Sequence, residues 1–197
     1  MSDLRWLPVT SMVAVTVVAV ATHAPARAAQ YATAEEAAKR SFPEATSFKE
    51  TTLQLSADEA RAVAQVTGLA PRAAPIRALV AWAGPVGSGS SGSEKPMGFV
   101  VIDAVIGKFE MIDFAVGVAA DGKIRNVEIL TYRESHGYEV RLPAWRKQFV
   151  GKGKSDKLRV DEDINNISGA TMSATHVTDG VRRIVATIDT LKLGGRL

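Results

Sequence analysis

The stretch Asn166–Ser173 holds the residues best suited to chemistry, because small hydroxylated side chains surround one glycine directly before an amphipathic helix. Ser173 or Thr171 can cap the first turn of that helix. Its free amides and the positive end of its dipole would then lie beside the Thr171 hydroxyl, which favours a phosphate-binding site. Gly169 allows the sharp turn and close backbone approach that such a site needs. Helical spacing defines the apolar face, with Val177, Val181, Ile184, Val185, Ile188 and Leu191.

A plain capping role is the simpler interpretation of the same residues. Ser and Thr before a helix most often serve only to accept hydrogen bonds from its first amides. Residue chemistry alone therefore leaves two possibilities open for this stretch, a helix cap and an anion site.

The four residues Ser168–Thr171 read Ser-Gly-Ala-Thr and resemble the flavinylation motif of the FMN-binding domain family. That family includes the flavin-carrying subunits of the sodium-pumping NADH:quinone reductases and of the Rnf electron-transport complexes. The resemblance implies FMN joined through its phosphate to Thr171 by a phosphodiester, which a separate flavin transferase makes from FAD. Family members usually have Asp three residues before the Ser, whereas this chain has Asn165, with Asp161 and Asp163 nearby.

The strongest strand signals lie upstream of this motif. Gly98–Val105 and Glu110–Ala119 are rich in Val, Ile and Phe, and a Gly-Lys turn separates them. Asp121-Gly122 makes the next turn, before a third strand from Ile124 to Leu130. Three antiparallel strands followed by a helix predict an α+β fold, not a doubly wound parallel sheet. We expect a twisted antiparallel sheet with packed helices, whose C-terminal amphipathic helix follows the flavinylation motif.

The turn Tyr132–Tyr138 follows these strands and also resembles the family, which commonly shows Glu-Thr-Pro-Gly here. Glu134 and Ser135 would hydrogen-bond the isoalloxazine or hold the shape of the loop. His136 stands in place of the proline and is either a solvated turn residue or a group that tunes flavin protonation. Gly137 would allow close backbone approach. Tyr138 and Trp145 would stack on a flavin or pack in the core, and core packing is expected for both.

The first residues of the chain have the pattern of an export signal. Arg5 precedes an apolar run from Leu7 to Ala21, and Ala26-Arg27-Ala28 offers a cleavage site. The run is short for a membrane-spanning helix, which needs about 20 apolar residues. We therefore expect residues 1–28 to be a cleaved signal peptide, with an uncleaved N-terminal anchor as the alternative. Either would place the rest of the chain in the periplasm or another extracytoplasmic space.

Residues 29–97 are expected to form a helical and strand layer that ends in a Gly/Ser-rich loop, before an FMN-binding domain at 98–197. Ala32–Arg40 and Ser56–Val66 have helix signals, the second with a capping box completed by Glu59. Ala78–Trp82 is a short apolar run of strand length. Gly84–Ser93 is either a hairpin loop, which we prefer, or a seam between two modules.

Composition excludes several other classes of function. The chain contains no cysteine, so disulfides and thiol chemistry are excluded. A formal net charge of +3 without a basic stripe predicts no nucleic-acid binding. Two histidines remain after the leader, which argues against a structural zinc site, and we expect no metal ligands. Asp161–Asp163 is expected to be a solvated acidic loop or part of the transferase recognition sequence. The Gly-Lys-Ser at 153–155 lacks the first glycine of a phosphate loop.

The resemblance, together with the leader, implies an extracytoplasmic flavoprotein that passes electrons between a membrane or haem partner and an acceptor. The flavin would supply the redox chemistry and the protein its attachment and orientation, so no residue is expected to be catalytic in its own right. The alternatives are a reductase of a small acceptor, and a non-redox binding or sensory module that has lost the flavin. The candidate cofactor-binding residues are Thr171, Ser168, Gly169, Ala170, Glu134, Ser135, His136 and Gly137.

Overall fold

A computed structural model describes residues 29–72, 75–84 and 96–197 of the chain. The expected signal peptide at 1–28 and most of the Gly/Ser stretch at 84–93 lie outside these residues. In chain order the elements are β1 (Ala29–Gln30), α1 (Ala34–Ser41), β2 (Ser47–Leu53), α2 (Ala57–Thr67), β3 (Ile76–Trp82), β4 (Gly98–Ile106), β5 (Met111–Ala119), β6 (Ile124–Tyr132), the 3-10 turn Tyr138–Arg141, α3 (Pro143–Arg146), the 3-10 turn Lys147–Phe149 and α4 (Thr171–Leu193).

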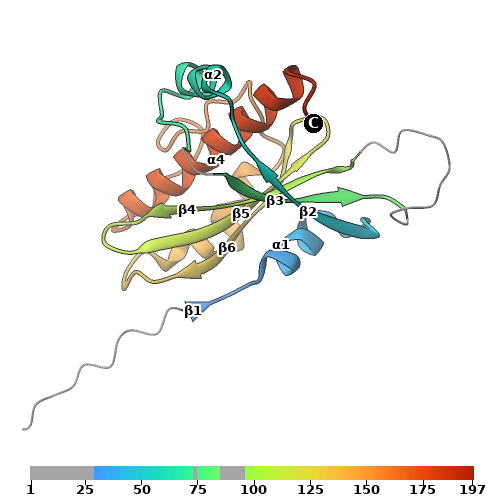
Figure 1. Cartoon of the computed structure of the whole chain (residues 1–197). Helices are drawn as coiled ribbons and strands as arrows, with labels where there is room; N and C mark the ends of the chain where they lie inside the picture. The colour runs from blue at the N-terminus through green and yellow to red at the C-terminus, as the bar shows by residue number, and fades with distance from the viewer. Residues whose placement is uncertain (1–28, 73–74, 85–95) are drawn as a thin grey trace, which may run out of the picture.

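The described strands form one curled antiparallel sheet in the order β1-β6-β5-β4-β3-β2 (Figure 1). The predicted α+β class and the antiparallel sheet are therefore confirmed. Strands β3 and β4, on either side of the Gly/Ser stretch, pair with each other, which is the arrangement of the hairpin interpretation. Two strands were not predicted, β1 and the edge strand β2.

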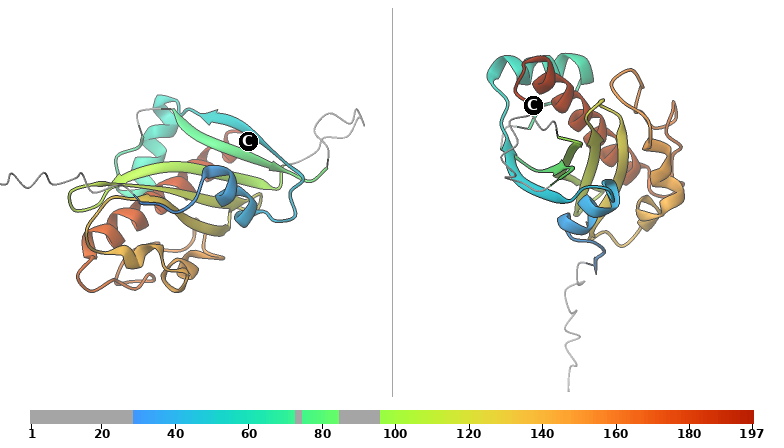
Figure 2. Two further views of the ribbon diagram at one scale, coloured as in Figure 1. Left: turned by 90° about the horizontal axis from the view of Figure 1, so that it is seen from below. Right: turned by 90° about the vertical axis from the view of Figure 1, so that its right-hand side faces the viewer.

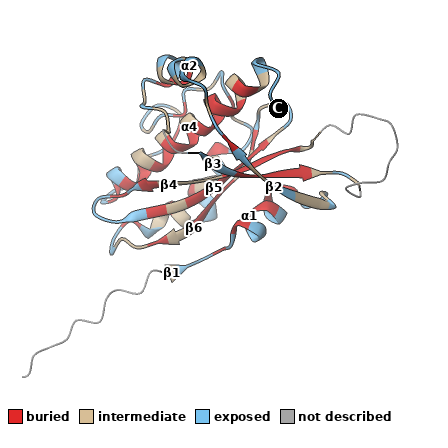
Figure 3. Ribbon diagram, viewed as in Figure 1, coloured by how far each residue is buried: buried red, intermediate tan, exposed pale blue. Residues whose placement is uncertain are grey.

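The two faces of the sheet are covered by different helices (Figures 1 and 2). Helix α4 packs on β4 and β5 across one face, and α2 packs on the outer side of α4. On the other face α1 packs on β5 and β6. The colours of Figure 3 show the buried side of α4 turned toward the sheet. All six predicted apolar positions of this helix are buried: Val177, Val181, Ile184, Val185, Ile188 and Leu191.

Local sequence explains why the two short helices begin where they do. Thr33 and Ser56 are their N-caps, and each forms the reciprocal capping box with the Glu three residues later. The predicted helices are thus confirmed, and α2 ends at Gly68 in the left-handed conformation. Among the described helices, none combines the length and apolar character needed to cross a bilayer.

The topology brings three segments to one end of the sheet. The tip of the β4–β5 hairpin lies there, because Met111 pairs with Ile106. The end of β6 lies beside it, since Tyr132 pairs with Ile112. The N-terminal end of α4 reaches the same end of the molecule (Figure 1).

Candidate functional site

A cavity of about 490 Å³ opens where these three segments meet. Glu134, Ser135 and His136 line it from the loop after β6, and Gly169, Ala170 and Thr171 line it from the start of α4. Its remaining lining residues are Lys108, Phe109, Met172 and Ser173. The fold thus brings the two predicted motifs together, although about thirty residues of chain separate them.

Gly137 makes this approach possible. Its φ of +81° lies in the left-handed region, and a Cβ added there would lie 2.6 Å from Ala170 Cβ and 2.8 Å from Tyr132 Oη. Glycine is therefore needed both for the backbone conformation and for the contact between the loops. The backbone of Gly137 thus lies close to Ala170 of the other motif. Gly137 itself does not line the cavity.

Thr171 is the first residue of α4 and is exposed at the cavity. The N-cap is Ala170, and no side chain caps the helix, so the predicted capping by Thr171 or Ser173 is wrong. Thr171 cannot cap because it already has helical geometry, one position too late to accept from the first turn. Within the described residues, no group accepts a hydrogen bond from the amides of Thr171, Met172 or Ser173. The helix end therefore presents free donors next to the Thr171 hydroxyl.

Ser173 is buried and belongs to the supporting structure of the site. Its Oγ lies 3.3 Å from Tyr132 Oη, and that phenol donates a hydrogen bond to the carbonyl of His136. Burial raises the pKa of Tyr132, and the hydrogen bond with Ser173 offsets this only in part. Tyr132 therefore stays a neutral donor that ties the end of β6 to its own loop and to α4.

Glu134 holds the tip of the β4–β5 hairpin. Its Oε1 accepts hydrogen bonds from the amides of Phe109 at 2.6 Å and of Glu110 at 3.0 Å. Burial alone would raise the pKa of this carboxyl, but the backbone amides of the hairpin outweigh it and lower the pKa. Gly107 has no room for a side chain against the Glu134 carboxylate. Glu134 thus ties the loop after β6 to the tip of the hairpin.

Ala170 is buried, whereas Ser135, His136, Ser168 and Gly169 are exposed. Ser135 Oγ lies 2.9 Å from His136 Nδ1, and both side chains face the cavity from its loop side. Ser168 is exposed but does not line the cavity, and Gly169, with a φ of +80°, has no atom near a would-be Cβ. Ser168 and Gly169 thus form an open turn that leads into α4.

Sequence reasoning missed the hairpin residues of the site. Phe109 is 72% exposed at the cavity, beside Lys108, whose Nζ lies 5.0 Å from the centre of the Phe109 ring. Met172 is also exposed there. The only signal available was an exposed Phe in a turn between two strong strands. The local sequence does not predict that this turn lies opposite α4 in the folded protein.

The two aromatic residues after the loop have different environments. Trp145 is buried, as expected, with its ring edge-to-face on Phe149 and its Nε1 donating to the carbonyl of Asn165 at 2.8 Å. Tyr138 is 51% exposed, so its expected core position is wrong. The 3-10 turn that begins at Tyr138 points this ring outward beside Arg141, whose guanidinium stacks on it.

The acidic run before the motif is a folded loop. Asp163 accepts from the amides of Leu158 and Arg159 and pairs with Lys152 at 3.1 Å. Burial alone would raise the pKa of Asp163, but these partners lower it. Asp161 and Glu162 are exposed. The backbone of Asn165 is held by Gln148 and Trp145, while no described residue bonds its side chain.

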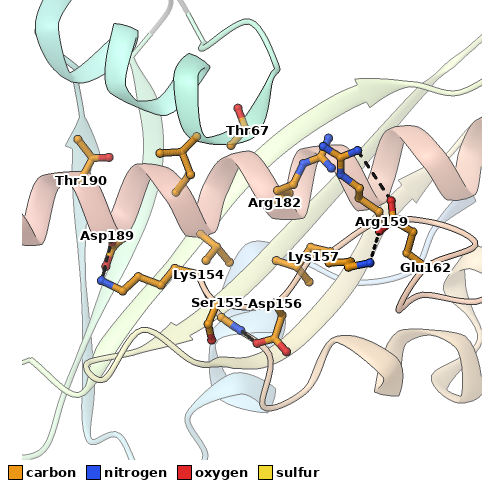
Figure 4. A pocket seen from close by; sticks show the side chains of 15 residues that line it. Thr67, Lys154, Ser155, Asp156, Lys157, Arg159, Glu162, Arg182, Asp189 and Thr190 are labelled. Atoms are coloured by element: carbon orange, nitrogen blue, oxygen red, sulfur yellow. Dashed lines mark hydrogen bonds and ion pairs between the residues drawn. The ribbon is translucent and has the colours of Figure 1, made fainter.

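A separate groove of about 400 Å³ lies between α2, α4 and residues 153–162 (Figure 4), and no residue of the two motifs lines it. Its lysines point toward carboxylates: Lys154 pairs with Asp189 at 3.0 Å and Lys157 with Glu162 at 2.8 Å. Because these charges are already neutralised in pairs, the groove has little to offer an anion. Within the described residues, no cluster of His, Asp and Glu could hold a metal ion.

An antiparallel sheet with an open cavity at the N-terminus of one long helix defines a small-ligand-binding α+β domain. Residues 107–186 match the family model of the FMN-binding domain. The match runs from the tip of the β4–β5 hairpin into α4 and so contains all the residues that line the cavity. The match confirms the resemblance over this part of the chain and supports an FMN-binding domain, with FMN as the cofactor of a flavoprotein. Among curated proteins, the comparison finds no match to the chain.

Proposed function

We propose that this flavoprotein carries FMN covalently, through a phosphodiester to the Oγ1 of Thr171. The observation that carries the proposal is the position of Thr171 as the exposed, uncapped first residue of α4 at the cavity. Free amides and the positive end of the dipole of a helix of 23 residues favour a phosphate at this point. A capping side chain would compete for these amides, and none is present among the described residues.

The other residues of the cavity fit the flavin by their chemistry. The exposed faces of Phe109 and Met172 offer apolar contact for a ring system. The cation of Lys108 compensates negative charge at the cavity. Glu134, held by the hairpin amides, fixes the position of Phe109. When bound, FMN supplies a redox group that accepts two electrons and releases them singly.

Attachment requires a flavin transferase that uses FAD. In this step the Thr171 oxygen forms a bond to the phosphorus of the FMN half, and the pyrophosphate bond of FAD breaks. AMP is the leaving group, and the hydroxyl proton is released. The protein supplies an accessible hydroxyl and an electropositive helix end for this transfer, so Thr171 is a modification site and not a turnover nucleophile.

We further propose that the domain works outside the cytoplasm as an electron-transfer module of a membrane-associated chain, with a membrane or haem partner. The apolar run from Leu7 to Ala21, followed by Ala26-Arg27-Ala28, supports export or anchoring. A covalent link would keep the cofactor in a compartment without a flavin pool. The exposure of Phe109 at the cavity supports approach of a redox partner to this end of the molecule.

Intact mass spectrometry after co-expression of the full chain with a flavin transferase tests the attachment. We expect one FMN adduct on the wild type, no adduct on Thr171→Ala, and a full adduct on the matched control Thr175→Ala, one helical turn further on. The same mass reports whether the leader is cleaved. A bare wild-type chain in the presence of transferase and FAD, or an adduct that survives Thr171→Ala, would refute the proposal.

A reductase of a small acceptor is the second candidate, and His136 is the observation that favours it. Its imidazole is exposed at the cavity and hydrogen-bonded to Ser135, where it can donate a proton to a reduced acceptor. Steady-state turnover of added acceptors by the flavin-loaded protein separates the two functions. Turnover that falls in His136→Asn, with flavin content unchanged, would favour the reductase.

A further inference from the structure

A second cavity of about 390 Å³ lies further along α4, beside the β4–β5 hairpin. Val105, Ile106 and Met111 give it an apolar wall, and Arg72 and Arg183 are its cations. His176 marks the boundary with the first cavity, since its Nδ1 lies 2.7 Å from the carbonyl oxygen of Ile106 and 3.2 Å from that of Gly107. The two cavities thus share the hairpin and the helix but not their lining residues.

Charges around this second cavity do not balance. Three arginines, Arg72, Arg182 and Arg183, meet two carboxylates, Asp103 and Asp179. Arg72 pairs with Asp103, and Arg182 pairs with Asp179 at 2.8 Å. Arg183 donates only to the carbonyl of Ala70, at 3.1 Å, and in the described part of the chain it has no carboxylate at ion-pair distance.

The arginines are also incompletely hydrogen-bonded. The Nε atoms of Arg72, Arg182 and Arg183 are all buried and have no partner among the described residues. Buried N–H groups are nearly always satisfied in folded proteins, so three such donors in one cluster are unusual. Burial lowers the pKa of Arg183, and the neighbouring arginines lower it further while Asp103 and Asp179 oppose them. The Arg183 charge is therefore desolvated without full compensation.

Another arginine-lined cavity in the same molecule provides the contrast. It has a volume of about 230 Å³ and is lined by Arg40, Arg125 and Arg146. There Glu128 pairs with Arg40 at 3.3 Å and with Arg146 at 3.1 Å, and a further carboxylate, that of Glu44, pairs with Arg125. None of these three arginines has a buried donor without a partner in the described residues. Each of these three arginines has a carboxylate partner, whereas Arg183 has none at ion-pair distance among the described residues.

We propose that the cavity beside Arg183 binds a small carboxylate with an apolar body. The carboxylate would pair with the outer nitrogens of the Arg183 guanidinium, which can hold it by two parallel hydrogen bonds. The apolar body would lie against Val105, Ile106 and Met111. Asp103 and Asp179 do not oppose this, because each is already paired with its own arginine. This carboxylate site does not depend on the flavin attachment, so the two proposals can fail independently of each other.

Titration of the full chain with benzoate, followed through the arginine Nε–H signals in ¹⁵N spectra, tests the site. Benzamide serves as a neutral ligand of the same shape. We expect benzoate to shift the Arg183 and Arg72 signals saturably and to raise the thermal midpoint, and benzamide to bind at least about tenfold more weakly. Arg183→Gln should weaken benzoate binding by about tenfold or more. Arg125→Gln, which removes an arginine already paired with Glu44, should leave it unchanged.

Several outcomes would overturn this proposal. They are the absence of any saturable shift with benzoate, an equal response to benzamide, and an equal loss of binding in Arg125→Gln. If Arg183→Gln does not fold, Arg183→Lys keeps the charge but loses the planar fork, and it should bind benzoate more weakly than the wild type. The comparison of benzoate with benzamide on the wild type needs no variant at all.

Discussion

Substitution of Gly137 by Ala tests whether contact between the two motif loops sets the geometry of the flavin site. Two separate costs arise at this position. The φ of +81° is unfavourable for any residue with a Cβ, and the new methyl group would lie 2.6 Å from Ala170 Cβ and 2.8 Å from Tyr132 Oη. Carbon atoms in good contact lie about 3.5–4.0 Å apart. One of the loops must therefore move, and Ala170 is the residue directly before Thr171.

The two costs can be separated with a matched control. Left-handed backbone costs a non-glycine residue about 1–2 kcal/mol, and overpacking costs about 1–3 kcal/mol more. Gly151 has nearly the same φ, +82°, and no atom within 4 Å of a would-be Cβ. Gly151→Ala should therefore lose only the first amount, whereas Gly137→Ala should lose about 2–5 kcal/mol in all. The difference between the two variants measures the loop contact.

Urea unfolding of both variants, with equal m-values as a check on two-state behaviour, gives these free energies. Flavin loading by the transferase is the functional readout. Gly137→Ala should load more slowly than the wild type because Ala170 and Thr171 are displaced, and Gly151→Ala should load normally. Equal stability losses in the two variants, together with normal loading of Gly137→Ala, would contradict our account of how the site is built.

Three further substitutions address single residues of the site. Ser168→Ala should reduce flavin attachment less than Thr171→Ala, measured by intact mass, because Ser168 lies outside the cavity. Glu134→Gln should destabilise the fold by about 1 kcal/mol at pH 7, because a charge-assisted acceptor of two amides is lost. The folded-state pKa of Glu134 is lowered, so this contribution is present above its unfolded pKa of about 4.3. It disappears as the pH falls through the folded pKa, and urea unfolding at pH 7 and pH 3.5 should show the difference from the wild type shrinking. Asn165→Asp should speed flavin attachment in a time course with the transferase, because it restores the acidic residue usual in the family. An unchanged rate would show that this position does not affect recognition.

Local signals in the sequence were sufficient for the helices α1, α2 and α4 and for most of the sheet. The capping boxes at Thr33 and Ser56 involve residues only three apart, so the chain determines them without tertiary help. The strands β4 to β6 are buried and rich in β-branched residues, and their pattern is correspondingly strong. Helix α4 was predicted from its apolar period because that face is buried along its whole length.

The elements and contacts that escaped prediction depend on distant residues. Strand β2 is an edge strand with Lys49 and Glu50 exposed, so it has little of the apolar signal of a central strand. It forms because β3 offers it a partner over seven residues. The start of α4 is another case: Ser and Thr favour a cap, but the loop geometry places Ala170 there instead. Tertiary structure here overrides a local preference worth about 1 kcal/mol.

The position of Thr171 follows from the packing of α4 on the sheet, some distance from the motif itself. Gly180 lies in the middle of this helix, and a Cβ there would lie 2.6 Å from the ring of Phe114 on β5. The helix can therefore approach the sheet closely at this point, and the apolar residues that follow hold it there by burial worth about 1.5–3 kcal/mol each. A rigid helix fixed at Gly180 also fixes its own first turn, nine residues earlier, beside the loop that Gly137 brings up. The hydroxyl that carries the proposed modification is thus exposed and chemically free, while the buried core sets where it lies.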